Sequence, residues 1–256
     1  NGLMERKITR MRPGTLGICS AIQNKYNVDT VPHVLCGGFT KEETEYLLVD
    51  CLYLGIDNVM ALRGDAMKGE NHFVPTEGGH AFAESLVKHI NDVGRGKYLS
   101  GEPACEDENR FCIGVAGYPE KHMEAPNINY DLQKLKAKVD AGADYVVTQM
   151  FFDNQKYFDF VNEARSIGIE VPIIPGIKPI ATKGHLSMLP KTFKIDLPEE
   201  LISEIEKAKN NTAVKEIGVE WAVQQCRELL DFGVPVLHFY SMGKSDNIKK
   251  VAAELF

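Results

Sequence analysis

The sequence predicts an α/β protein of the (β/α)8 TIM-barrel class, and three observations carry that prediction. A unit of amphipathic helix, glycine stop, short polar step and apolar strand recurs along the 256 residues. The strands are almost continuously apolar, which is typical of a parallel sheet covered by helices on both faces. Residues that can bind or react follow every strand, and such a barrel builds its site from the loops at its strand ends.

The expected elements follow in order along the chain. The sequence from Thr40 to Glu43 predicts a capped helix start, and Gly55 ends the apolar stripe behind it. Six strands are expected, so two of the eight strands of a closed barrel are absent, and we expect them to precede Asn1. Residues 1–256 are then a single barrel domain. The expected strands are 31–35, 58–62, 111–116, 145–152, 171–174 and 236–240, and the expected helices are 40–55, 81–93, 131–142, 158–168, 199–209 and 221–233.

Composition excludes several classes of protein. The 44% hydrophobic and 25% charged residues are close to globular averages, and no apolar run is long enough to span a bilayer. The net charge of −7, with both signs interspersed, argues against a nucleic-acid or anionic-membrane binder. Six cysteines do not form a disulfide scaffold in this length, so a reducing cytoplasm is expected. Clustered metal ligands, a P-loop and a Rossmann glycine fingerprint are all missing from the sequence.

Two strand ends carry residues that suit a charged, planar ligand. Arg63-Gly64-Asp65 follows a buried strand, and an arginine there can hold phosphate or stack on a ring. A surface turn with a local ion pair is the alternative. Tyr118 and His122 follow the next strand and suit a sandwich around a planar cofactor. A loop packed by its own aromatic side chains explains them equally well.

Four other positions each have two interpretations. His33 lies in a strand, where a hydrogen-bonded core histidine is more common than a ligand. Asp131 and Lys138 are seven residues apart on one helix face, which is either solvated or turned to a ligand. Gln149 lies in an apolar strand, so its amide pairs with backbone or recognises a substrate.

Taken together, these strings resemble the methylenetetrahydrofolate reductase family, from about Pro32 to Phe256. Each motif is short, but their order and spacing are highly specific. The motifs are Pro32-His33, Ala61-Leu62-Arg63-Gly64-Asp65, Ala116-Gly117-Tyr118-Pro119-Glu120, Asp140-Ala141-Gly142-Ala143-Asp144, Thr148-Gln149-Met150-Phe151-Phe152-Asp153, Ile174-Pro175-Gly176-Ile177 and His238-Phe239-Tyr240.

The resemblance implies FAD at the carboxyl ends of the strands, with NADH or NADPH as reductant, a folate substrate and a homo-oligomeric assembly. No nucleic-acid or membrane partner is expected. The implied substrate contacts are Asp65, Gln149, His185 and Lys244. The implied cofactor contacts are His33, Ala61, Leu62, Arg63, Gly64, Asp65, Phe82, Ala83, Tyr118, His122, Ala125, Asp131 and Lys138.

The resemblance also implies a ping-pong reaction through flavin N5 that yields 5-methyltetrahydrofolate. Asp65 is the implied catalytic residue, because its carboxylate favours the iminium cation that the opened folate ring forms. The family's general acid is a glutamate on the first strand, which this sequence does not contain. Three residues depart from relatives: Lys134 replaces asparagine, Ala137 replaces arginine, and Lys244 replaces an arginine.

Two other functions remain open from the sequence. A non-catalytic barrel that keeps the family surface as a binding or assembly partner is favoured by the absent acid strand and opposed by the full set of flavin-type residues. A metal-dependent barrel hydrolase is disfavoured because ligand clusters are missing.

Overall fold

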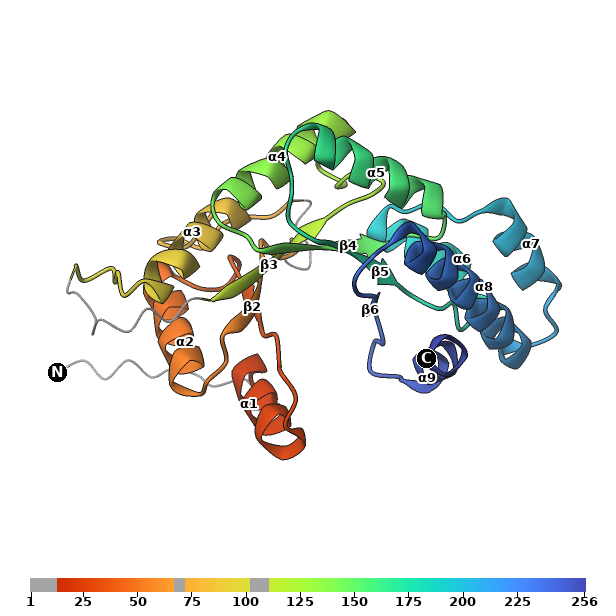
Figure 1. The fold of residues 1–256 in the computed structure, drawn as a ribbon, viewed down its shortest axis with the longest axis horizontal. Helices are drawn as coiled ribbons and strands as arrows, with labels where there is room; N and C mark the ends of the chain where they lie inside the picture. The colour runs from red at the N-terminus through yellow and green to blue at the C-terminus, as the bar shows by residue number, and fades with distance from the viewer. Residues whose placement is uncertain (1–12, 67–71, 102–110) are drawn as a thin grey trace. The chain divides into compact units, whose positions relative to one another are not determined.

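The computed structural model describes residues 13–66, 72–101 and 111–256 (Figure 1). The chain divides into two compact units, Asn1–Ile113 and Gly114–Phe256, and each is described by itself. Helices alternate with strands, and each strand pair within a unit is parallel, which confirms the predicted α/β class. The single barrel domain over residues 1–256 stays a prediction.

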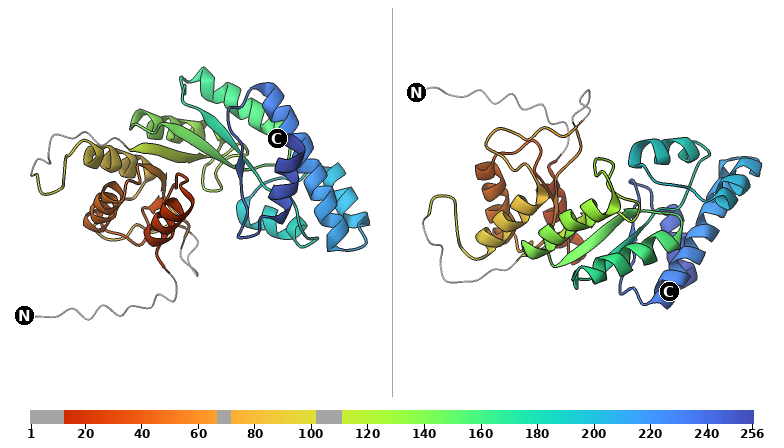
Figure 2. Two further views of the ribbon diagram at one scale, coloured as in Figure 1. Left: turned by 60° about the horizontal axis from the view of Figure 1, so that its bottom comes forward. Right: turned by 90° about the horizontal axis from the view of Figure 1, so that it is seen from above.

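The described residues of the first unit form two paired strands and three helices, and Figure 2 draws this unit in red to yellow. In the pair, His33 lies opposite Met60, and Leu35 lies opposite Leu62. The backbone N–H of Cys112, near the end of the unit, donates to the carbonyl of Asp57 at 2.8 Å. The elements are α1 (Thr15–Tyr26), β1 (His33–Leu35), α2 (Lys41–Tyr53), β2 (Asn58–Leu62) and α3 (Ala83–Gly94).

Helix α2 begins at the capping box that the sequence predicts. The Thr40 hydroxyl accepts from the Glu43 N–H at 3.2 Å, and the Glu43 carboxylate accepts from the Thr40 N–H at 3.0 Å. Helix α2 then buries Leu48 and Cys51, and α3 buries the face that includes Leu86 and its neighbours. The two helices pack on each other, and α3 also packs on β2. These contacts form the core that supports the loop after β2.

The second unit is built on four neighbouring parallel strands in chain order. Gly114 lies opposite Tyr145, Val146 opposite Ile173, and Gly176 opposite His238. The strands are β3 (Cys112–Gly117), whose first residues fall in the first unit, β4 (Tyr145–Met150), β5 (Ile173–Ile177) and β6 (His238–Phe239), and the helices are α4 (Ile128–Asp140), α5 (Asn154–Ser166), α6 (His185–Phe193), α7 (Glu199–Lys207), α8 (Asn211–Phe232) and α9 (Asp246–Leu255).

Polar contacts from α8 hold the end of β4 in place. The indole N–H of Trp221 donates to the Phe152 carbonyl at 3.0 Å. The buried side chain of Gln225 donates to the Phe151 carbonyl at 3.3 Å. An apolar cluster lies beside these bonds and joins β4, α6, α7 and α8, with Met150, Phe152, Ile180, Leu189, Ile195, Leu201, Ile205 and Val214 as its buried members.

Several predicted boundaries differ from the structure. Strand β5 continues through Gly176, whose N–H donates to the Thr148 hydroxyl at 3.0 Å, whereas the sequence interpretation ended this strand at residue 174. Helix α8 begins ten residues before the predicted start, since Asn210 accepts from the N–H groups of Thr212 and Ala213 and caps it. Helices α1, α6 and α9 were not predicted.

The close approach of α8 to the segment after β5 gives a first prediction. A Cβ atom added at Gly218 would lie far inside the contact distance of the Ile180 carbonyl. We expect Gly218→Ala to lower the free energy of unfolding by about 2 kcal/mol or more, as overpacking of a core does. Urea unfolding followed by circular dichroism measures the change.

Gly17→Ala is the matched control, because Gly17 is exposed in α1 and an added Cβ there meets only Pro13 at 4.0 Å. This variant should be neutral or more stable by up to about 1 kcal/mol, since alanine is the better helix former. Equal stability of Gly218→Ala and the parent chain would contradict the packing described here.

Candidate functional site

The segment after β2 presents the first group of expected ligand residues. Ala61 is buried and Leu62 half-buried in the strand, and Arg63, Gly64 and Asp65 follow it. The Gly37 N–H donates to the Arg63 carbonyl at 3.2 Å, and the Arg63 guanidinium lies 5.1 Å from the centre of the Phe73 ring. Asp65 is exposed. This end of the strand therefore offers a cation stacked on a ring and an accessible carboxylate.

Gly64 has a backbone conformation that only glycine adopts readily. Its φ is +91°, and an added Cβ would lie 3.9 Å from the Gly37 nitrogen. The turn that leads from Arg63 to Asp65 thus depends on glycine for its conformation rather than for space.

Three more expected flavin residues lie in the same unit. His33 is exposed at the start of β1, and the desolvation that its ring still experiences lowers its pKa. Phe82 is the N-cap residue of α3 and is 61% exposed, and Ala83 is the first residue of that helix. An exposed aromatic ring at a helix start is available to contact a ligand.

In the second unit, the structure brings together five expected flavin residues at the carboxyl end of β3. The Tyr118 and His122 rings meet edge to face, with centroids 4.7 Å apart. The Asp131 carboxylate, from α4, accepts from the backbone N–H of His122 at 2.8 Å. The Lys138 ammonium donates to the Ala116 carbonyl at 2.5 Å, and Ala125 is buried at the end of the loop.

The chemistry of this group fits a flavin dinucleotide. An aromatic ring and an imidazole lie side by side, and the Lys138 ammonium lies close to the same strand end. The His122 Nδ1 accepts from the Glu124 N–H at 3.1 Å, so a neutral ring carries its proton on Nε2. Flat faces suit a ring system, and a cation suits a diphosphate. The edge-to-face contact between the two rings corresponds to the loop packed by its own aromatic side chains, and the sandwich around a planar cofactor stays a prediction.

Glu120 lies in the same loop, and the sequence interpretation gave it no role. Its Oε2 accepts from the Asp196 N–H at 2.7 Å, and its Oε1 is buried without a hydrogen-bond partner among the described residues. Burial is the main cause that raises the pKa of Glu120 to about 7. The charges of Asp196 and Asp153 act in the same direction, and the Asp196 N–H and the charge of Lys156 oppose them. Only its position in the Ala116–Glu120 motif could have pointed to it.

A second polar group lies after β5. Lys178 is 7% exposed, and its ammonium donates to the Tyr240 carbonyl at 3.3 Å. Burial lowers the pKa of Lys178, and burial together with the charge of Lys178 lowers the pKa of His185. The Nδ1 of His185 accepts from the Ala181 N–H at 3.3 Å. The sequence alone gave no sign that the Lys178 ammonium is buried.

Gln149 and Lys244 are the two remaining expected folate residues, and Gln149 follows Thr148, which lies opposite Gly117 at the end of β3. Gln149 is half-buried in β4, and its side-chain oxygen accepts from the Met150 N–H at 3.0 Å. Lys244 is exposed between β6 and α9. Within the described part of the second unit, no hydrogen bond or ion pair joins either residue to Tyr118, His122, Asp131 or Lys138.

The described ranges contain neither a metal-ligand cluster nor a membrane-spanning helix. In residues 13–66, 72–101 and 111–256, no three histidine, cysteine, aspartate or glutamate side chains form a group that could hold a metal ion. No helix in those ranges is both long enough and apolar enough to cross a membrane.

Comparison with known proteins decides the family. Residues 8–255 match the family model described as methylenetetrahydrofolate reductase. The chain belongs to the methylenetetrahydrofolate reductase family. This confirms the resemblance that the motifs carried.

Two relatives show the extent of the similarity. Methylenetetrahydrofolate reductase (NADH) 1 of Arabidopsis thaliana is 41% identical over 239 residues, which cover 89% of this chain and 38% of the relative. The 5,10-methylenetetrahydrofolate reductase of Pectobacterium carotovorum is 29% identical over 92% of this chain and 72% of the relative. The chain therefore spans well under half of the plant reductase that it matches.

One solved structure shares the fold. It is described as an uncharacterized protein from Clostridium thermocellum that binds two copies of 5-methyl-5,6,7,8-tetrahydrofolic acid. The TM-score is 0.57, the identity is 16%, and the match covers 91% of this chain and 76% of that protein. The likeness confirms a TIM-barrel-type α/β fold for this member of the reductase family.

The raised pKa of Glu120 gives a prediction about stability and pH. The folded state holds a proton on Glu120 up to about pH 7, whereas the unfolded chain releases it near pH 4.5. The stability that this proton provides is complete below the unfolded pKa and is lost as the pH rises through about 7. We expect Glu120→Gln, which stays neutral, to gain about 1–2 kcal/mol over the parent between pH 5 and pH 8, after allowance for partial solvent screening.

Urea unfolding of both chains across that pH range measures the difference. Glu163→Gln removes an exposed carboxylate from α5 and should show no such trend. A Glu120→Gln variant whose stability runs parallel to that of the parent at every pH would contradict the burial of this carboxyl group.

Proposed function

We propose that this chain binds FAD and reduces 5,10-methylenetetrahydrofolate to 5-methyltetrahydrofolate with NADH or NADPH. The observation that carries the proposal is the group at the end of β3, where Tyr118, His122, Asp131 and Lys138 lie together in a chain of this family. The motifs around them are the ones on which the sequence resemblance rests.

In this proposal, Tyr118 and His122 of the loop after β3 and Asp131 and Lys138 of α4 each contribute to FAD binding. The Tyr118 and His122 rings supply flat faces, and the Lys138 ammonium supplies the charge that a diphosphate requires. Asp131 holds the loop in place through the His122 N–H. When bound, FAD carries the two electrons of a hydride from the nicotinamide to the folate.

The overall reaction consumes one hydride and one proton. The C–N bond between the bridging methylene carbon and folate N10 breaks, N10 gains the proton, and the methylene carbon gains the hydride to become a methyl group. NADH or NADPH is oxidised, and the folate is reduced. The proton donor for N10 is not assigned to a residue of this chain.

Asp65 and Gln149 act on the folate in this proposal. Opening of the five-membered ring leaves a positive charge on the N5 iminium group, and the Asp65 carboxylate stabilises that charge. Asp65 is exposed at the end of β2, so a substrate can reach it. The Gln149 side chain has both donors and an acceptor with which to orient the pterin ring. His185 and the positively charged Lys244 remain the proposed contacts to the rest of the folate.

We also propose a cytoplasmic location and a homo-oligomeric assembly for the protein. The free cysteines Cys19, Cys36, Cys51 and Cys226 support a reducing compartment. The oligomer rests on the family resemblance.

A spectroscopic titration tests the proposal. The purified chain, mixed with FAD and separated from free dye, should retain the visible absorbance of a flavin. NADH or NADPH should bleach that absorbance, and 5,10-methylenetetrahydrofolate should restore it. A chain that binds FAD but is not reoxidised by the folate would sink the reductase activity and favour a binding role.

Substitution of Asp65 gives the matching prediction for catalysis. Asp65→Asn keeps the size of the side chain and removes its charge, so we expect folate-dependent reoxidation of the reduced flavin to slow by about 10²- to 10³-fold. Reduction by NADH should change far less, because no iminium cation forms in that half-reaction. Stopped-flow absorbance measures the two half-reactions separately.

Asp57→Asn is the control for charge alone. Asp57 is exposed just before the other end of β2, so its loss should leave both rates within about twofold of the parent. Equal slowing of both half-reactions by Asp65→Asn would show that Asp65 does not act on the folate cation.

A further inference from the structure

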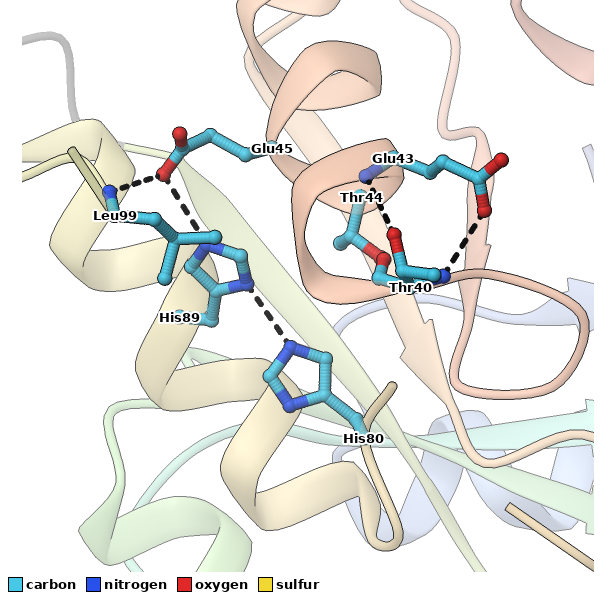
Figure 3. A network of polar contacts seen from close by, with 7 residues as sticks. All are labelled: Thr40, Glu43, Thr44, Glu45, His80, His89 and Leu99. Atoms are coloured by element: carbon cyan, nitrogen blue, oxygen red, sulfur yellow. Dashed lines mark hydrogen bonds and ion pairs between the residues drawn. The ribbon is translucent and has the colours of Figure 1, made fainter. Parts of the chain in front are cut away.

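A continuous line of four polar side chains lies in the first unit, and Figure 3 shows three of them, Glu45, His89 and His80. Glu45 belongs to α2, His80 precedes α3, and Ser85 and His89 belong to α3. The His89 Nε2 lies 3.5 Å from a Glu45 oxygen, the His89 Nδ1 lies 2.9 Å from the His80 Nε2, and the His80 Nδ1 lies 3.1 Å from the Ser85 hydroxyl.

One end of the line contacts Phe82, the N-cap residue of α3. The Ser85 hydroxyl lies 2.9 Å from the Phe82 carbonyl and donates to it. The other end is fixed as well, since the Leu99 N–H donates to the same Glu45 oxygen at 2.8 Å. His80 is 4% exposed and His89 is 7% exposed, so both rings must find partners inside the protein.

Counting the protons shows one arrangement in which His89 is charged. If Ser85 donates to Phe82, its oxygen accepts from the Nδ1–H of His80. The His80 Nε2 is then bare and accepts from the Nδ1–H of His89. The His89 Nε2 faces a carboxylate oxygen that cannot donate, so it also carries a proton. His89 is an imidazolium in this arrangement and forms an ion pair with Glu45.

Removal of one proton leaves a second arrangement that also satisfies every ring nitrogen. His89 keeps only its Nε2–H, which donates to Glu45. The His80 proton moves to Nε2 and donates to the bare Nδ1 of His89, and the Ser85 hydroxyl turns to donate to the His80 Nδ1. The Phe82 carbonyl then loses its bond from Ser85. Loss of a proton at His89 therefore removes the Ser85 hydrogen bond from the carbonyl of Phe82, the N-cap residue of α3.

We propose that Glu45, His89, His80 and Ser85 form a proton-coupled chain that positions Phe82 and Ala83 for the flavin. The chain has two proton arrangements: the Phe82 carbonyl accepts from the Leu86 N–H in both, and from the Ser85 hydroxyl only in the protonated one. Phe82 and Ala83 enter as flavin contacts through the proposed function, so this part of the inference rests on it. All four are positioning residues, since each acts on the cofactor through Phe82.

The surroundings assign the titrating proton to His89. Burial, together with the charges of His89 and Lys41, lowers the pKa of His80 to about 4, so His80 stays neutral at moderate pH. The charged groups of α2 that act on the two rings are Lys41, Glu42 and Glu45. Of these groups, Glu45 makes the contact with the His89 ring, at 3.5 Å.

Nitrogen-15 NMR of the whole chain, without added flavin, tests the two arrangements. His80 should carry its proton on Nδ1 at low pH and on Nε2 at high pH, and this change should coincide with the titration of His89. The Phe82 carbonyl carbon should shift at the same pH. A His80 ring that keeps one tautomer while His89 titrates would overturn the chain.

Glu45→Gln shows whether the carboxylate holds the charge on His89. The amide oxygen can still accept from the Leu99 N–H, but the negative charge is gone. The pH at which both rings change should fall by about one unit or more. An unchanged midpoint would show that Glu45 is not part of the chain.

The FAD affinity tests the link to the proposed site. The dissociation constant should rise about three- to tenfold as the pH passes upward through the His89 titration, which corresponds to the loss of one hydrogen bond at Phe82. Ser85→Ala should flatten this profile, because it breaks the link between His80 and Phe82. Ser187→Ala, which removes a bond of the same kind to the N-cap residue of α6, should keep the parent profile.

The outcomes separate the two proposals. A chain that binds no FAD at any pH removes the proposed function, and the NMR experiment still decides whether the proton chain exists. FAD binding with the same pH profile in Ser85→Ala and the parent chain overturns the coupling to Phe82.

Discussion

The loops after the strands depend on side chains that satisfy their backbone polar groups. A strand-end loop leaves the sheet ladder, so its N–H and C=O groups need other partners. Helix α4 supplies two of them, since Asp131 accepts from the His122 N–H and Lys138 donates to the Ala116 carbonyl. Thr76 accepts from the Gly38 N–H in the first unit, and Glu120 accepts from the Asp196 N–H in the second. Each such bond contributes about 1 kcal/mol and fixes the shape of a loop.

Because these side chains satisfy loop backbone groups, Asp131 and Lys138 have both a structural role and a proposed ligand-binding role. Asp131 and Lys138 shape the loop in the structure, and the family resemblance also assigns them to the flavin. A substitution at either position therefore affects both loop shape and binding. Asp65 follows Gly64 and is exposed. A substitution there is better suited to test catalysis without changing the shape of a loop.

The strands were predicted well because their apolar runs leave few alternatives. Strand β2 was predicted at its observed bounds, Asn58–Leu62. Helices α1 and α6 were missed, since α1 has no buried residue and α6 contains Pro190 inside it. The early start of α8 follows from the cap at Asn210, which a search for apolar periodicity does not detect.

The strand-end motifs identified Arg63, Tyr118 and His122, because their chemistry is visible in a few adjacent residues. Glu120 and the His80–His89 pair were missed for the opposite reason. Glu120 meets Asp196 across 76 positions of sequence, and His89 meets Glu45 across 44. Their burial and their partners exist only after folding, and a local pattern does not contain them.

Hydrogen–deuterium exchange, with and without FAD, tests most directly whether the strand-end loops bind the cofactor. Exchange should slow in the peptides that contain Gly64 and His122, and it should not change at Asp57 and Asn58, at the other end of β2. Slower exchange only at those amino-terminal positions, or no change anywhere under conditions that saturate the chain with FAD, would contradict flavin binding by strand-end loops.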